Sequence, residues 1–86
     1  MPFVELSVRA QNFLDKLAKD AKERIEKKLK NLENNPIPSD TKFIGRDNDE
    51  MIFRYRIGKF RALYKFKKAQ NIILITKIDK RDKVYD

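Results

Sequence analysis

The stretch FRYRIGKFRALYKF, from Phe53 to Phe66, decides the fold because it predicts a β-hairpin with a fixed register. Apolar residues alternate with polar ones on both sides of Gly58-Lys59, and hairpins favour a two-residue turn that begins with glycine. Such a turn pairs Ile57 with Phe60, and the pairs behind them follow. On one face these are Tyr55 with Ala62, Phe53 with Tyr64, and Met51 with Phe66.

The two faces of the predicted hairpin differ in their chemistry. The first is continuously apolar, so we expect it to form the floor of the core. On the second face Arg56 lies opposite Arg61, and a like-charge pair of this kind costs a few tenths of a kcal/mol, up to about 1. The same register places Arg54 opposite Leu63 and Ile52 opposite Lys65.

The sign of the charge on the second face needs an explanation. The residues Arg54, Arg56, Arg61 and Lys65 predict a basic face that contains no acid. Simple solvent exposure is the alternative, but it explains the polarity and not the sign. A bound phosphate backbone explains both, because guanidinium groups grip phosphate oxygens in pairs.

The rest of the chain predicts an α+β fold in a single domain, residues 1–86. A short strand at Phe3–Leu6 precedes a helix that Ser7 caps, with apolar residues at helical spacing. A second helix is predicted from near Asp20 to Asn34, where a proline-containing loop ends it. Next come a short strand around Lys42–Ile44 and an antiparallel meander, and we expect the helix hairpin to pack on one face of this sheet.

Composition limits the chemistry that this chain can perform. It contains no cysteine and no histidine, which excludes disulfides, thiol nucleophiles and the usual zinc sites. The net charge is +8, and it is uneven: residues 1–40 have a balance of +1, and residues 41–86 one of +7. This asymmetry favours a polyanionic partner, with nucleic acid first and an anionic membrane surface second. Because no signal peptide or membrane-spanning run is visible, we expect a cytoplasmic protein.

Three further segments carry charge patterns of their own. The tail has a second basic cluster, Lys80, Arg81 and Lys83, followed by Tyr85, which could stack on a base or exchange a proton.

The acidic run from Asp47 to Glu50 lacks the glycine and distal glutamate of a calcium loop and suits a turn, so no metal site is expected. The lysine-rich second helix interleaves acids with its lysines and lacks an aromatic anchor, which favours a solvated helix over a membrane-surface one.

Taken in order, these segments resemble the RelE family of toxins. The resemblance covers nearly the whole chain: the helix hairpin, KFIG (Lys42–Gly45), FRYRI (Phe53–Ile57), FRALY (Phe60–Tyr64) and KRDKVY (Lys80–Tyr85). It implies a toxin that cuts messenger RNA in the ribosomal A site without metal or another cofactor. It also implies a cognate, RelB-like antitoxin, which by charge complementarity should be acidic and carry an amphipathic helix.

The resemblance also implies roles for individual residues. Arg61 and Arg81 would stabilise the charge of the transition state, Arg54 and Arg56 would hold the flanking phosphates, and Tyr85 would transfer a proton or stack on a base. Lys65, Lys80 and Lys83 would add RNA contacts. Better-known members of the family have lysines where this chain has Arg54 and Arg56. Because arginine stays protonated, the identity of the general base is left open.

Two alternatives stay open on the sequence alone. The ParE toxins share the scaffold and poison DNA gyrase, but they do not need the convergent arginines and tyrosine. A non-catalytic RNA- or DNA-binding module would need only the basic sheet face.

Overall fold

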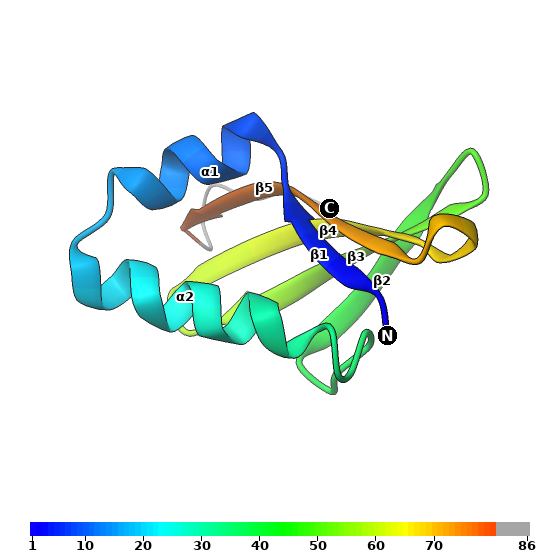
Figure 1. Cartoon of the computed structure of the whole chain (residues 1–86), viewed down its shortest axis with the longest axis horizontal. Helices are drawn as coiled ribbons and strands as arrows, with labels where there is room; N and C mark the ends of the chain where they lie inside the picture. Colours follow the sequence, from blue (N-terminus) through cyan, green and yellow to red (C-terminus); the bar gives the residue numbers. More distant parts are fainter. Residues whose placement is uncertain (81–86) are drawn as a thin grey trace.

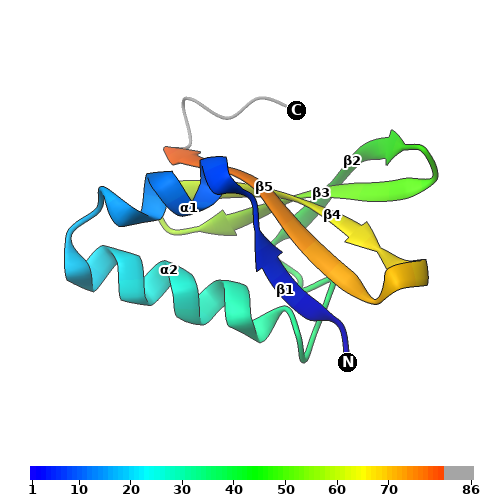
Figure 2. The same ribbon diagram turned by 45° about the horizontal axis from the view of Figure 1, so that its top comes forward.

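The computed structural model describes residues 1–80, which form one mixed sheet covered on one face by two helices (Figure 1). The strand order is β1-β5-β4-β3-β2, and no helix of residues 1–80 covers the second face of the sheet, which we call the open face (Figure 2). This arrangement confirms the predicted α+β fold. The elements are β1 (Phe3–Leu6), α1 (Val8–Asp15), α2 (Lys19–Asn31), β2 (Thr41–Asp47), β3 (Glu50–Ile57), β4 (Phe60–Lys67), the 3₁₀ helix η1 (Lys68–Gln70) and β5 (Ile72–Lys80).

The β3–β4 hairpin has the predicted register, with Ile57 opposite Phe60 and Arg56 opposite Arg61. Gly58 has a φ of +57°, a left-handed conformation that glycine adopts without steric cost. The turn between β2 and β3 also follows the prediction, because Asn48 and Asp49 both have positive φ. Both hairpin turns therefore lie at the residues that the sequence predicts, Gly58 and Asn48-Asp49.

Strand β1 joins the sheet in a way that the sequence did not reveal. It pairs in parallel with β5, so that Phe3 lies beside Ile72 and Leu6 beside Ile75. The backbone N–H of Val4 donates a hydrogen bond of 2.9 Å to a carboxylate oxygen of Glu33. This contact occupies part of the exposed strand edge and ties it to the segment that follows α2.

Helix α1 begins as predicted, and α2 ends earlier than predicted. The hydroxyl of Ser7 accepts a hydrogen bond from the N–H of Ala10 and donates one to the carbonyl of Thr76. Helix α2 ends at Asn31 and not at Asn34, so the predicted boundary was wrong by three residues. Beyond Asn31 the backbone continues in turns whose hydrogen bonds join residues i and i+3, such as the bond from Asn34 N–H to Asn31 O at 3.0 Å.

The core lies between the two helices and the inner face of β3, β4 and β5. Tyr64 is fully buried at its centre, stacked on Phe53 with ring centroids 5.4 Å apart. Its hydroxyl donates a 2.7 Å hydrogen bond to the carbonyl of Pro36, which anchors the loop before β2. The buried apolar residues are Ala10, Leu14, Ile25, Leu29, Leu32, Phe53, Tyr55, Ile57, Ala62, Tyr64, Ile73, Ile75 and Ile78.

Strand β2 is longer than the predicted Lys42–Ile44 and irregular. It pairs antiparallel with β3, but the register shifts between Phe43 and Gly45. An extra residue at such a bulge bends the strand and re-aims the side chains on either side of it. The first half of β2 is thereby placed beside Arg54.

Replacing Gly58 by alanine should destabilise the fold by about 1 to 2 kcal/mol, because the left-handed conformation is unfavourable for residues with a Cβ. For a domain of this size, each kcal/mol lowers the melting temperature by roughly 4 to 8 °C in thermal unfolding followed by circular dichroism.

The matched control for this change is Gly45→Ala. Gly45 has no positive φ, and a Cβ placed on it would meet no atom within 4 Å, so the melting temperature of this variant should change little. Equal melting temperatures of the two variants would contradict the argument about the turn.

Candidate nucleic-acid interface

The open face of the sheet contains a cavity of about 280 Å³ at the end where the β3–β4 turn lies. We call this cavity the basic hollow. Its described lining holds four cations and one acid, and it opens on the face opposite the core because its strand residues alternate with the buried ones. The lining residues are Ser39, Asp40, Thr41, Lys42, Arg54, Arg56 and Arg61.

Three of the predicted site residues meet in the basic hollow. Arg56 faces Arg61 across the hairpin, and Arg54 lies next along the same face of β3. Lys42 of β2 is the cross-strand partner of Arg54 and adds a fourth cation that the sequence interpretation missed. The predicted convergence of Arg54, Arg56 and Arg61 is therefore present.

Backbone contacts hold the wall that precedes β2. The N–H of Arg56 donates a 3.0 Å hydrogen bond to the carbonyl of Asp40, which extends the β2–β3 ladder by one residue. The hydroxyl of Thr41 donates to the carbonyl of Pro38 at 2.7 Å. Asp40 and Lys42 are therefore held beside the arginines by the sheet itself.

Arg61 is oriented by its own turn. One guanidinium nitrogen, Nη1, donates to the carbonyl of Gly58 at 3.0 Å and to that of Phe60 at 2.9 Å. These hydrogen bonds fix the guanidinium plane before any ligand arrives, which reduces the entropy lost on binding. Asp79 of β5 lies beside Arg61 in the ladder, and its carboxylate accepts the backbone N–H of Lys80 at 2.8 Å.

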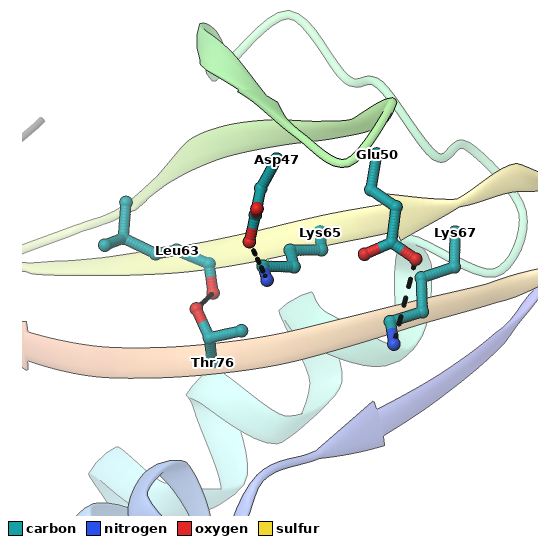
Figure 3. A network of polar contacts seen from close by, with 6 residues as sticks. All are labelled: Asp47, Glu50, Leu63, Lys65, Lys67 and Thr76. Carbon is teal, nitrogen blue, oxygen red and sulfur yellow. Dashed lines mark hydrogen bonds and ion pairs between the residues drawn. The ribbon is translucent and has the colours of Figure 1, made fainter.

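Lys65 does not line the basic hollow, and its surroundings correct one prediction. Its Nζ donates a 2.6 Å hydrogen bond to Asp47, and Lys67 lies 3.8 Å from Glu50 in the same region (Figure 3). The expectation that this sheet face contains no acid was therefore wrong. The acids come from the end of β2 and the start of β3, which the Phe53–Phe66 hairpin does not include.

The tail residues are divided by the limit of the described chain. Lys80 is exposed, ends β5 and pairs with Phe60, so it lies at the same end of the sheet as Arg61. Arg81, Lys83 and Tyr85 lie outside the described residues, and their assignments stay predictions.

Residues 1–80 offer neither a metal site nor a membrane-spanning helix. No group of three or more carboxylate, histidine or cysteine side chains there could hold a metal ion. Neither described helix has the length and apolar character required to cross a membrane.

A second cavity, of about 460 Å³, lies between α2 and the β3–β4 turn. We call it the apolar groove. Its floor is formed by apolar side chains and its rim carries three cations, Arg24, Lys28 and Lys59, with no acid among the described lining residues. The remaining lining residues are Ala21, Ile25, Ile57, Gly58 and Phe60. The helical spacing of apolar residues predicted the buried face of α2, but no sequence signal indicated that a groove is left beside it.

Comparison with known proteins identifies the class to which this fold belongs. Residues 4–85 match the family described as the ParE toxin of the type II toxin–antitoxin system parDE. A protein of Methanocaldococcus jannaschii that carries the name toxin RelE1 is 32% identical over 83 residues, or 95% of this chain and 92% of the relative. The chain belongs to the RelE/ParE superfamily of toxins of type II toxin–antitoxin systems, which confirms the resemblance noted from its motifs.

Solved structures share this fold at lower sequence identity. The archaeal RelE–RelB complex from Pyrococcus horikoshii matches with a TM-score of 0.85 at 23% identity, covering 96% of this chain and 98% of that one. The RelBE2 complex of Mycobacterium tuberculosis gives 0.77 at 23% identity, with coverages of 94% and 100%. The E. coli RelBE complex gives 0.73 at 21% identity, with coverages of 93% and 96%.

The ion pair between Lys65 and Asp47, which lies outside the basic hollow, can be tested by titration. The hydrogen bond from Lys65, followed by its charge, holds the pKa of the Asp47 carboxyl below its ordinary value. Lys65→Met should therefore raise the pKa of Asp47 toward that ordinary value, as measured by carboxyl NMR. Asp15 is the internal control, because its pKa is lowered mainly by Lys22 and should not move.

The sign of the effect on stability follows from the same shift. Because folding lowers the pKa of Asp47, the pair stabilises the fold above the unfolded-state pKa, and this contribution is lost as the pH falls through the folded-state pKa. An Asp47 pKa that is the same in the parent and in Lys65→Met would contradict the assigned pairing.

Proposed function

We propose that the chain, acting as a single domain in the cytoplasm, is an endoribonuclease that cuts messenger RNA in the ribosomal A site and so inhibits translation. The observation that carries this proposal is the convergence of Arg54, Arg56, Arg61 and Lys42 on one small cavity of an otherwise mixed-charge face. A phosphodiester and its neighbouring phosphates carry the charge that such a cavity binds best.

The reaction needs charge stabilisation more than a metal ion. The 2′-hydroxyl loses a proton and attacks the adjacent phosphorus, the phosphorane gathers negative charge, and the 5′-oxygen leaves. Arg61 suits the middle step because its own turn orients it, and Arg81 is proposed to assist it. Arg54 and Arg56 would hold the flanking phosphates, because one guanidinium group can donate two parallel hydrogen bonds to a phosphate.

The remaining predicted residues would extend the RNA contacts. Lys80 and Lys83 would bind phosphates at the tail, and Tyr85 would stack on a base or transfer a proton. Lys65, paired with Asp47, would contribute a weaker contact because its charge is already compensated. The ribosome would supply the orientation of the RNA, which accounts for a large share of catalysis in systems of this kind.

The proposed protein partner is an acidic, RelB-like antitoxin. Three of the structures that share the fold are complexes of RelE-type toxins with their antitoxins, which supports an antitoxin for this chain. The apolar groove fits the expected amphipathic helix, since an apolar floor would receive its apolar face and the rim cations would meet its acids.

Gyrase poisoning is the second candidate function, because the family that matches residues 4–85 is described as ParE. The two functions separate in one experiment. Purified protein is incubated with translating ribosomes and, in parallel, with gyrase and supercoiled DNA. Cuts in the A-site codon support the proposed function, gyrase-linked DNA breaks support the second candidate, and RNA binding without cleavage supports a plain binding module.

Arg61→Ala should lower the rate of A-site cleavage by about 100-fold or more, because it removes a preorganised cation from the transition state. Primer extension on stalled ribosome complexes measures the rate. Arg81→Ala should have an effect of the same order.

The control for these variants is Arg9→Ala, which removes an exposed arginine from α1, on the helix side of the sheet. All three variants should retain the parental circular dichroism spectrum. Cleavage by Arg61→Ala at the rate of Arg9→Ala would refute the role given to Arg61.

Reversing the rim charge of the apolar groove should weaken antitoxin binding. The double variant Arg24→Glu and Lys28→Glu should raise the Kd for the product of an adjacent acidic reading frame by about 10-fold or more, since like charges then meet across the interface. Isothermal titration calorimetry measures this change.

The charge-matched control is Lys19→Glu with Lys27→Glu, which alters the same helix outside the groove. If both double variants bind the antitoxin equally well, the groove is not where the helix sits.

A further inference from the structure

The basic hollow contains a pair of titratable groups that the arginines cannot replace. RNA cleavage needs one group that accepts a proton and one that donates a proton, and arginine does neither because it stays protonated. Among residues 1–80, the carboxylate and amine in the lining of the hollow are Asp40 and Lys42. Resting on the proposed ribonuclease function, we propose that Asp40 is the general base and Lys42 the general acid.

Both residues line the hollow from the segment where β2 begins. Lys42 follows Thr41, whose cross-strand partner is the buried Tyr55, so the side chain of Lys42 lies on the face opposite the core. Asp40 comes directly before β2; burial raises the pKa of the Tyr55 hydroxyl, and the charge of Asp40 raises it further. The Asp40 carbonyl is tied to Arg56, and Lys42 pairs with Arg54. Both residues are exposed, so a phosphodiester held by the arginines can reach them from solvent.

The other described acids on this face are committed elsewhere. Asp47 and Glu50 pair with Lys65 and Lys67 at the far end of the sheet. Asp79 lies beside Arg61, but its carboxylate accepts the N–H of Lys80 and it does not line the hollow. Asp40 is therefore the acid that the described structure offers to a substrate in the hollow.

The chemistry of the two side chains matches these roles. A carboxylate can accept a proton, and an ammonium group can donate one. Among the described lining residues, four cations outnumber the one carboxylate, which favours a phosphate as the ligand. The arginines also stabilise the forming phosphorane, which favours removal of the proton by a weak base.

The step balances without any other reactant. The 2′-hydroxyl gives its proton to the Asp40 carboxylate, and the oxygen forms a bond to phosphorus. The bond from phosphorus to the 5′-oxygen breaks, and that oxygen takes a proton from the Lys42 ammonium. The products are a 2′,3′-cyclic phosphate and a 5′-hydroxyl, with Asp40 protonated and Lys42 neutral until they exchange protons with water.

The test uses charge-preserving or isosteric variants and two RNAs on the same stalled ribosomes. One RNA is natural, and the other carries sulfur in place of the 5′-bridging oxygen at the cleavage site. A thiolate leaves without a proton, so the sulfur RNA does not need the general acid. Lys42→Arg should be about 100-fold slower than the parent on the natural RNA and close to the parent on the sulfur RNA.

Asp40→Asn should behave differently from Lys42→Arg. It should be about 100-fold slower on both RNAs, and its rate should rise with pH as hydroxide replaces the missing base. Asp49→Asn and Lys16→Arg are the matched controls, because both positions are exposed and outside the hollow, and they should cut at the parental rate. Ribosome binding by each variant is measured separately to exclude a defect in association.

The outcomes separate this inference from the function on which it rests. A parent protein that does not cut on ribosomes refutes the ribonuclease function itself. A parent that cuts while Asp40→Asn cuts equally well overturns the general base, and an equal defect of Lys42→Arg on both RNAs overturns the general acid. Loss of cleavage in Tyr85→Phe, with Asp40→Asn unaffected, would assign the base to the tail.

Discussion

Because Gly58 turns the chain in a left-handed conformation, Ile57 is held opposite Phe60, and this register fixes both faces of the sheet. A slip by one residue would move Tyr55 and Tyr64 into water and the arginines into the core. Burial of each large apolar side chain is worth about 1.5 to 3 kcal/mol, more than the cost of up to about 1 kcal/mol for opposing Arg56 and Arg61. Burial of the apolar face therefore keeps the like charges next to one another on the other face.

The open face is divided into two electrostatic halves, and this division accounts for where a polyanion would bind. At one end Asp47 and Glu50 compensate Lys65 and Lys67. At the other end the described lining residues of the basic hollow include four cations and one acid. Clustered charge raises the local potential there, so Lys42, Arg54, Arg56 and Arg61 act together at one place.

The sequence predicted the features that depend on local pattern and failed where distant segments meet. The hairpin register, the Ser7 cap and the Asn48-Asp49 turn follow from neighbouring residues and were confirmed. The parallel pairing of β1 with β5 joins segments far apart in the chain, and no local signal encodes it. The position of Lys42 beside the arginines was not predicted. It depends on the β2 bulge near Gly45 and on the loop that Tyr64 anchors.

The basic hollow and the apolar groove share one structural wall, the β3–β4 turn. Arg56 and Arg61 line the hollow. The residues between them in the sequence, Ile57 to Phe60, line the groove. The carbonyls of Gly58 and Phe60 that hold the Arg61 guanidinium belong to the residues a helix in the groove would touch. The conformation of this one turn therefore determines both the shape of the groove and the orientation of Arg61 in the hollow.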